Sequence, residues 1–263
     1  MKKISSADNY LVKKAIRLKK SVFRRKQKEF LIDGQREIRV ALDNHWSCSW
    51  FFYSPDFKSH SLDQNFSDVI KDNIVELPGP LFSKICYKEN PDGFLAIFKQ
   101  NHQKLKDIVL SSNPLCLILE NVEKPGNLGA IIRTTAAVGV DVIIINEAQT
   151  DIYNPNVIRS SEGYVFAVPI VKASVVDTAS WLKTNNIRSF GTLTTASKTY
   201  TTADFNGPTA IILGSEARGL SDKWVKTLDE SIFIPMRSGL DSLNVSVAGA
   251  VVLYEVLRQR SAK

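Results

Sequence analysis

Residues 115–146 read LCLILENVEKPGNLGAIIRTTAAVGVDVIIIN. A near-continuous apolar run over 115–119 is followed by a glycine-bearing loop, a stretch with helical spacing and a second apolar run. Such runs are typical of strands that are buried on both faces of a parallel sheet. Asn127 can cap the intervening helix over 128–138, and Gly139 suits the residue that follows its last turn. The stretch therefore predicts a strand–helix–strand unit of an α/β protein with a mostly parallel sheet.

The same kind of pattern continues on both sides of this unit and divides the chain. After residue 140, hydrophobic spacing predicts strands over 141–146, 190–193, 210–213 and 232–234, and a final helix over 244–260. Before residue 113 it predicts helices over 7–19 and 35–43 and strands over 30–32, 50–53 and 95–98. We therefore expect a small α/β domain over 1–105, a polar linker over 106–113 and a second α/β domain over 114–263.

Composition excludes several classes of protein. Of the 263 residues, 44% are hydrophobic and 23% are charged, which is ordinary for a globular protein and unlike a disordered or fibrous one. No run approaches the roughly 18 apolar residues needed to span a membrane, so no membrane partner is expected. Three cysteines cannot form a disulfide framework, which favours a reducing compartment and a cytoplasmic location.

Positive charge is concentrated at the start of the chain. Residues 1–28 contain eleven Lys or Arg and one acid, a net charge of +10, whereas the whole chain carries +7. A local basic segment is the electrostatic footprint of a polyanion such as RNA, although a solvated helix without a partner has the same composition. The expected phosphate contacts are Lys13, Lys14, Arg17, Lys19, Lys20, Arg24, Arg25 and Lys26. The nearby aromatic residues Trp46, Trp50, Phe51 and Phe52 can stack on bases, but core packing is the favoured interpretation.

The second half of the chain has a restricted set of chemical groups. All three histidines precede residue 113, and so does every cysteine except Cys116. A histidine base, a Cys–His pair and a zinc site are therefore excluded there, and no metal is expected. Its chemistry has to rest on arginine, serine, asparagine, carboxylates and backbone groups.

Three glycine-bearing loops follow predicted strands of this second half. They cover residues 120–129, 214–219 and 235–244. Loops at the carboxyl ends of parallel strands are where open α/β sheets bind ligands. The loop 214–219 lacks the spacing of a dinucleotide-binding fingerprint, which argues against a nucleotide-dependent oxidoreductase.

Taken together, the loops resemble the three motifs of the SpoU (TrmH-like) RNA 2′-O-methyltransferases of the SPOUT superfamily. The first motif is matched by Asn121, Asn127, Gly129 and Arg133, the second by 213–219, and the third by 234–236 and 242–248. The first hundred residues resemble the L30e/L7Ae-like RNA-binding domain that precedes the catalytic domain in the 23S rRNA guanosine methyltransferase and thiostrepton-resistance branches.

The resemblance implies an activity, a fold and partners. The activity is methyl transfer from S-adenosylmethionine to a ribose 2′-hydroxyl in RNA, with 23S rRNA and guanosine favoured. The implied fold is a knotted (trefoil) α/β methyltransferase domain behind a small L30e/L7Ae-like α/β domain. A homodimer through the C-terminal domain is implied as well. A tRNA 2′-O-methyltransferase and a catalytically silent RNA-binding or ribosome-assembly protein are the alternatives.

Roles for individual residues follow from the same resemblance. Arg133 is expected to clamp a phosphate and orient the hydroxyl, with proton abstraction as the sharper hypothesis. Asn121 is expected to hold the loop or the ribose, and Glu216 to position Arg133 or the substrate. Ser242 and Asn244 are expected to orient substrate or cofactor, although by local chemistry both are helix N-caps. Matches to cofactor-contacting positions are Gly214, Ile234 and Leu243, the last two of which otherwise suit a core.

Overall fold

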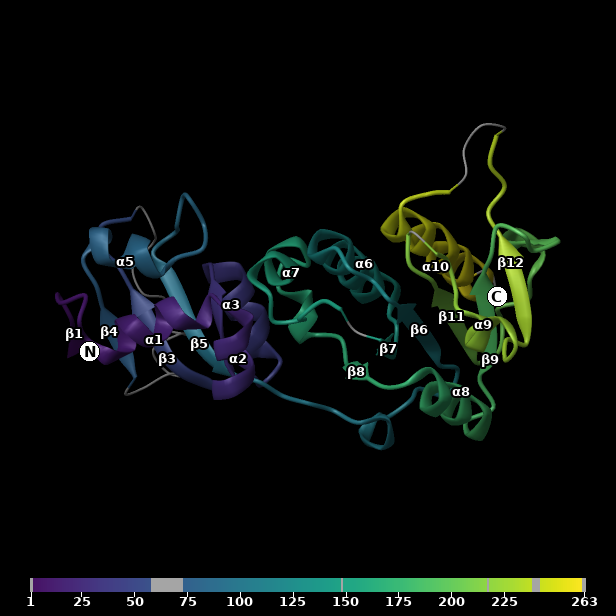
Figure 1. Cartoon of the computed structure of the whole chain (residues 1–263), viewed down its shortest axis with the longest axis horizontal. Coiled ribbons are helices and arrows are strands. Elements are labelled where there is room, and N and C mark those ends of the chain that lie inside the picture. The colour runs from purple at the N-terminus through teal and green to yellow at the C-terminus, as the bar shows by residue number, and fades with distance from the viewer. Residues whose placement is uncertain (1, 58–72, 148, 217, 238–241, 262–263) are drawn as a thin grey trace. The chain divides into compact units, whose positions relative to one another are not determined.

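Figure 1 shows the computed structural model of the chain, which describes residues 2–57, 73–147, 149–216, 218–237 and 242–261. The chain forms two compact units. The first unit comprises residues 1–101 together with 151–167, and the second comprises 102–150 together with 168–263.

The first unit is built on a mixed five-stranded sheet in the order β1-β4-β3-β5-β2. Its strands are β1 (Lys2–Lys3), β2 (Glu29–Asp33), β3 (Cys48–Tyr53), β4 (Ile74–Glu76) and β5 (Phe94–Lys99). Its helices are α1 (Tyr10–Leu18), α2 (Ser21–Gln27), α3 (Gln35–Asp43), α5 (Gly79–Ile85), α7 (Pro155–Ser160) and the 3₁₀ turn η2 (Tyr164–Phe166). β5 is antiparallel to both β2 and β3, whereas β4 is parallel to β1 and β3.

The segment 151–167 reaches the first unit from the middle of the second half of the chain. Its Tyr153 and Phe166 rings stack on Phe30 of β2, with centroid separations of 4.5 and 5.6 Å. Trp46 donates a hydrogen bond from Nε1 to the carbonyl of Phe166 at 2.9 Å. In Figure 1 the teal helix α7 lies beside the purple α3. The observed division therefore differs from a simple cut after residue 105, because aromatic packing brings 151–167 to the first unit.

The second unit is built on a wholly parallel seven-stranded sheet in the order β10-β12-β9-β11-β6-β7-β8. Its strands are β6 (Leu115–Glu120), β7 (Val142–Asn146), β8 (Ile170–Lys172), β9 (Arg188–Thr192), β10 (Lys198–Thr199), β11 (Thr209–Leu213) and β12 (Glu230–Phe233). Its helical elements are η1 (Leu105–Asp107), α6 (Pro125–Val138), α8 (Val175–Thr184), η3 (Tyr200–Thr202), α9 (Asp222–Val225) and α10 (Val245–Ser261). The central strands β6, β7 and β11 are buried along their whole length, as their apolar runs predict.

The predicted elements are confirmed, with one correction at a helix start. Each predicted strand and helix has a counterpart that begins and ends within a few residues of the prediction. Gly139 ends α6 in the left-handed conformation, with φ of 80°, as expected. However, α6 begins at Pro125 with Lys124 as its N-cap, so Asn127 is not the cap but belongs to the first turn. Proline favours the first helical position because it has no N–H that would need a partner.

Candidate active site

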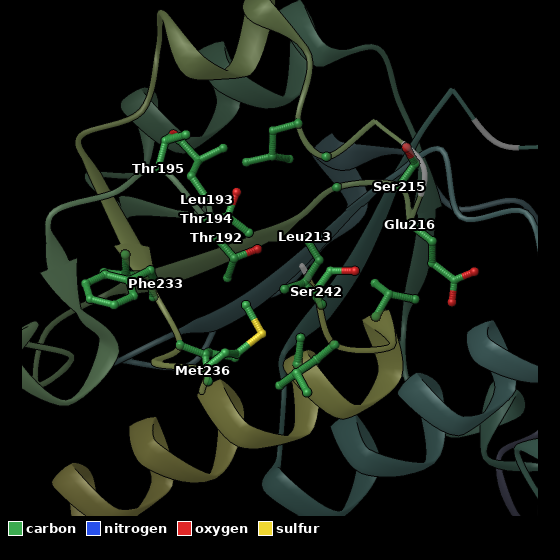
Figure 2. Close-up of a pocket in the computed structure, with 18 of the residues that line it drawn as sticks. Thr192, Leu193, Thr194, Thr195, Leu213, Ser215, Glu216, Phe233, Met236 and Ser242 are labelled. Atoms are coloured by element: carbon green, nitrogen blue, oxygen red, sulfur yellow. The ribbon is translucent and has the colours of Figure 1, made fainter. Parts of the chain in front are cut away.

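A cavity of about 940 Å³ lies in the second unit. Its walls come from the ends of β9, β11 and β12, from the loops that follow them, and from the start of α10. Figure 2 shows Thr192, Leu193, Leu213, Met236 and Ser242 around it. Parallel strands bring their carboxyl ends to one edge of the sheet, so the glycine-bearing loops that follow β11 and β12 meet here, as predicted.

The loop after β11 is closed tightly on itself. Ser215 and Gly219 exchange two backbone hydrogen bonds, at 3.1 and 3.0 Å. A Cβ on Gly214 would lie only 2.1 Å from the carbonyl carbon of Gly219, so glycine is required at this position. Gly219 itself has φ of 65°, a conformation that glycine adopts at little cost. The described residues of the loop are therefore constrained at Gly214, Ser215 and Gly219, beside the cavity.

A buried carboxylate anchors the far end of this loop. Glu120 ends β6 and is only 2% exposed. It accepts hydrogen bonds from the backbone N–H of Ser221 at 2.8 Å and from its hydroxyl at 2.7 Å. β6 pairs with β11 in the register Leu119↔Leu213, so the two strands that flank this contact end side by side. Glu120 thus acts as a positioning residue for the loop over 214–221.

Glu216 joins three separate segments at the edge of the cavity. Its Oε1 accepts hydrogen bonds from Asn127 Nδ2 at 2.5 Å and from Asn244 Nδ2 at 2.9 Å. Its Oε2 pairs with Lys124 Nζ at 2.8 Å. Asn244 also donates to Asn127 Oδ1 at 3.2 Å. We call Lys124, Asn127, Glu216 and Asn244 the Glu216 cluster; it brings together the first turn of α6, the loop after β11 and the start of α10.

The same contacts keep the Glu216 carboxylate ionised. The hydrogen bond from Lys124 lowers the pKa of Glu216, and the charge of Lys124, the Asn127 amide and the backbone N–H of Val245 act in the same direction. The Lys124 pKa is raised in return by its hydrogen bond to Glu216. An ionised carboxylate that already accepts several hydrogen bonds is a weak proton acceptor. The geometry therefore fits Glu216 as an organising residue rather than a general base.

Most of the predicted site residues meet at this cavity. Gly214, Glu216, Ile234, Ser242 and Leu243 all line it. Asn244 joins them through Glu216, and its Oδ1 also accepts hydrogen bonds from the Ser246 backbone N–H and hydroxyl, as an N-cap does.

Asn121 and Arg133 are not among the residues that line the cavity. Asn121 lies in the turn after β6 with φ of 55°, and its backbone N–H donates to the carbonyl of Asn146 at 3.2 Å. Arg133 is an exposed residue of α6, six residues beyond Asn127 or about 9 Å along the helix axis. Asn127, which the sequence offered both as a helix cap and as a motif residue, contacts Glu216 and Asn244 instead of capping the helix. Its position on the same helix as Arg133 is the signal that could have favoured it.

Cysteine and histidine do not serve this site in the described part of the chain. Burial raises the pKa of the Cys116 thiol to about 12, so it carries no thiolate at neutral pH. His102 is the first residue of the second unit. Its side chain is exposed and does not line the cavity. Among the described residues, no group of three or more His, Cys, Asp and Glu is arranged to hold a metal ion. In the same residues, no helix is long and apolar enough to cross a membrane.

Comparison with known proteins connects this geometry to a reaction. Residues 114–254 match the SpoU rRNA Methylase family, and residues 9–96 match the MRM3-like substrate binding domain. The chain belongs to the SpoU rRNA methylase family. It is 27% identical to the 23S rRNA (guanosine(2553)-2′-O)-methyltransferase RlmP of Bacillus subtilis, over 97% of this chain and 99% of that protein.

Two further relatives cover most of the chain. A 23S rRNA (uridine(2479)-2′-O)-methyltransferase of Streptomyces viridochromogenes is 28% identical over 88% of this chain and 83% of that protein. The crystal structure of an AdoMet-bound rRNA methyltransferase from Sinorhizobium meliloti superposes with a TM-score of 0.89 at 28% identity, covering 98% of this chain and 97% of that one. The α/β fold and the methyltransferase activity expected from the motifs are thereby confirmed.

The cavity of this SpoU protein fits S-adenosylmethionine, the methyl donor of the family. Its volume lies within the range of roughly 300–1,000 Å³ that small-molecule sites occupy. Leu193, Ile234 and Leu243 supply apolar walls for an adenine, and the Thr194 and Thr195 hydroxyls lie on the same lining. When bound, S-adenosylmethionine supplies an electrophilic methyl group on a sulfonium. The leaving group is a neutral thioether, so its departure needs no metal.

Five of the eight basic residues that were predicted to contact RNA phosphates have exposed side chains in the first unit. They lie on or beside α1 and α2, and their side chains reach solvent: Lys13, Arg17, Lys20, Arg25 and Lys26. Lys14 pairs with Glu29, and Lys19 donates to the carbonyls of Lys84 and Cys86.

Arg24 does not belong to that surface, which corrects its assignment as a phosphate contact. The residue is only 2% exposed. It donates to the carbonyls of Leu18 and Lys19 at 3.0 and 2.8 Å and pairs with Asp151 at 2.8 Å. These contacts of the Arg24 guanidinium link α1, α2 and the segment 151–167. The aromatic residues Phe51 and Phe52 are fully buried, as the core interpretation predicts.

Proposed function

We propose that this protein methylates the ribose 2′-hydroxyl of a guanosine in 23S rRNA. The observation that carries the proposal is the Glu216 cluster at the edge of the cavity, which places organised polar groups beside the site of the methyl donor. RlmP of Bacillus subtilis, which spans almost the same length, is named for guanosine in 23S rRNA. The uridine named for the Streptomyces relative makes uridine the second candidate base.

The residues of the chain supply orientation rather than a strong base. A ribose hydroxyl is a poor nucleophile, so removing or polarising its proton speeds its attack. In our proposal Arg133 binds an RNA phosphate and orients the hydroxyl, because a guanidinium stays protonated in proteins. The cluster holds Asn127 and Asn244 so that their amides bracket the substrate, and Ser242 lies on the cavity wall beside them. Proton abstraction by Arg133 is the sharper alternative.

Three finer features belong to the same proposal. The family resemblance supports a trefoil knot in the second unit. A homodimer through that unit is supported by α10, which exposes Val247 (48%) and Tyr254 (52%), two turns apart on one face. Free cysteines at 48, 86 and 116 support a reducing, cytoplasmic location.

Methyl transfer to separated RNA pools tests the proposal. Labelled S-adenosylmethionine is offered with unmodified 23S rRNA, 16S rRNA and tRNA, and Arg133→Ala is the control. The modified position is then mapped by the resistance of 2′-O-methylated linkages to alkali. We expect label in 23S rRNA at a guanosine, and none with the variant. Label in tRNA alone would replace the substrate with tRNA. S-adenosylmethionine binding without transfer to any pool would indicate that an assembly intermediate is the substrate. Neither transfer nor S-adenosylmethionine binding would favour the silent RNA-binding protein.

A further inference from the structure

Two arginines line the cavity from two different loops. Arg218 lies in the loop after β11, and Arg237 follows β12 by four residues. Both are exposed. Within the described residues, neither guanidinium has an ion pair or a side-chain hydrogen bond. The established parts of the site, the cofactor walls and the Glu216 cluster, leave these two charges without an assigned role.

The described residues that line the cavity include no free acid to neutralise them. Glu216 is the only carboxylate among the described residues that line it. That carboxylate is already paired with Lys124 at 2.8 Å and accepts hydrogen bonds from Asn127 and Asn244. The lining together with Lys124 therefore carries a net charge of about +2, which draws anions to the opening.

Described residues of the loop hold the backbone of Arg218. Its backbone N–H donates to Ser215 Oγ at 3.1 Å, inside the turn that Ser215 and Gly219 close. Glu120 fixes the end of the same loop through Ser221. A cation on a pre-shaped loop loses less conformational freedom on binding than one on a mobile segment, so it is suited to recognition.

The charge of each reactant identifies which anion this edge holds. S-adenosylmethionine carries a sulfonium, an ammonium and a carboxylate, so its net charge is +1 and a cationic edge does not favour it. RNA carries a phosphodiester on each side of every ribose, so a phosphate necessarily comes close to the cavity when a 2′-hydroxyl reacts there. Arginine matches phosphate with two parallel N–H donors.

We propose that Arg218 and Arg237 form a phosphate-binding edge of the active-site cavity, which holds a phosphodiester of the RNA next to the ribose that is methylated. The proposal rests on the methyltransferase activity of the family and adds two substrate-positioning residues to it. It concerns contacts at the reaction site and is separate from the basic surface of the first unit.

Arg218→Ala and Arg237→Ala in the full-length protein test the proposal. Methyl transfer is measured at saturating S-adenosylmethionine on whichever unmodified RNA pool the wild type labels. We expect the KM for RNA to rise roughly tenfold for each variant, because hydrogen bonds to charged groups contribute substantially. The slope of log KM against log salt should fall by about 0.7–0.9 per arginine. Lys226→Ala, which removes an exposed cation away from the cavity, is the matched control and should change neither quantity.

A second experiment distinguishes binding of an RNA phosphate from binding of the cofactor carboxylate, and it does not depend on methyl transfer. Calorimetry measures binding of S-adenosylhomocysteine and of 5′-methylthioadenosine, which lacks the amino-acid part. We expect both variants to bind both nucleosides as the wild type does, which also shows that the cavity is folded. Arg218→Lys and Arg237→Lys, which keep the charge, should keep the salt slope. Loss of S-adenosylhomocysteine affinity with methylthioadenosine binding unchanged would overturn the proposal in favour of a carboxylate site. RNA KM and salt slope equal to those of Lys226→Ala would overturn it as well.

Discussion

The Glu216 cluster in the second unit and the basic segment of the first unit use charge in opposite ways. In the cluster, one carboxylate accepts hydrogen bonds from Lys124, Asn127 and Asn244, which come from two distant parts of the chain. In the basic segment, cations such as Arg25 and Lys26 lie on neighbouring positions of one helix. The first arrangement depends on each partner, whereas the second depends mainly on the sum of the charges.

Arg24 shows that the distinction is not one of residue type. Arg24 and Arg25 are adjacent in sequence, yet Arg24 is buried against two backbone carbonyls and Asp151, and Arg25 is exposed. A buried, fully hydrogen-bonded arginine contributes to folding, and an exposed one is available to RNA. We therefore expect a large effect from substituting a residue with defined partners, and a small effect from substituting one of several exposed cations whose charges add together.

The largest expected effect is on catalysis at Arg133. Arg133→Ala should lower kcat by about 10²-fold or more, because a hydroxyl that has lost its orienting group is misplaced for attack. S-adenosylmethionine affinity should stay near the wild-type value, because Arg133 does not line the cavity. Single-turnover transfer and calorimetry measure the two quantities. Turnover comparable to wild type would remove Arg133 from the mechanism.

Substitution of Glu216 tests the cluster itself. Glu216→Gln keeps the shape but cannot pair with the Lys124 ammonium, and it offers one acceptor oxygen in place of two. We expect kcat to fall by roughly 10–100-fold, as for hydrogen bonds to charged groups worth about 1.5–3 kcal/mol. Lys124→Ala should cost less, because that ion pair is largely exposed. If Glu216→Gln retained full kcat, the cluster would be only structural.

A pair of neighbouring arginines sharpens the comparison on stability. Arg24→Ala leaves Asp151 and two carbonyls without their partner, so it should lower the free energy of unfolding by roughly 3–5 kcal/mol. Arg25→Ala should change it by less than about 0.5 kcal/mol. Urea unfolding followed by tryptophan fluorescence measures both. Equal midpoints for the two variants would contradict the structural role of Arg24.

The smallest individual effects are expected on the basic surface. A single substitution by glutamine should raise the RNA KM only a few-fold at each of five positions: Lys13, Arg17, Lys20, Arg25 and Lys26. The slope of log KM against log salt should fall by about 0.7–0.9 for each phosphate that is no longer neutralised. The five together should weaken RNA binding strongly with little effect on S-adenosylmethionine affinity. An unchanged salt slope in the combined variant would show that this surface does not touch RNA. Deleting 1–105 is a poorer test, because it would expose the aromatic residues of 151–167.

The elements with strong local signals were predicted well. The apolar runs of β6, β7 and β11 are long enough to specify buried strands, and Gly139 ends α6 as its type suggests. The short strands β1, β4, β8 and β10, with two or three residues each, have too little periodicity to be recognised. The helices α2, α5, α7, α8 and α9 were not predicted either. The contribution of 151–167 to the first unit was not predicted, because Tyr153 and Phe166 lie far along the chain from the Phe30 ring that they cover.

The sequence by itself determined the α/β class and the three loops, because these depend on local patterns of residue type, and it indicated the reaction and the cofactor through the resemblance of its motifs to the SpoU family. It also placed most of the cavity residues, since neighbouring strands of a parallel sheet end at a common edge. Only the tertiary structure decided that Asn127 rather than Asn121 contacts Glu216, that Arg24 is buried, and that Arg218 and Arg237 share one cavity. These facts depend on distances between segments that are remote in sequence, and no local spacing encodes them.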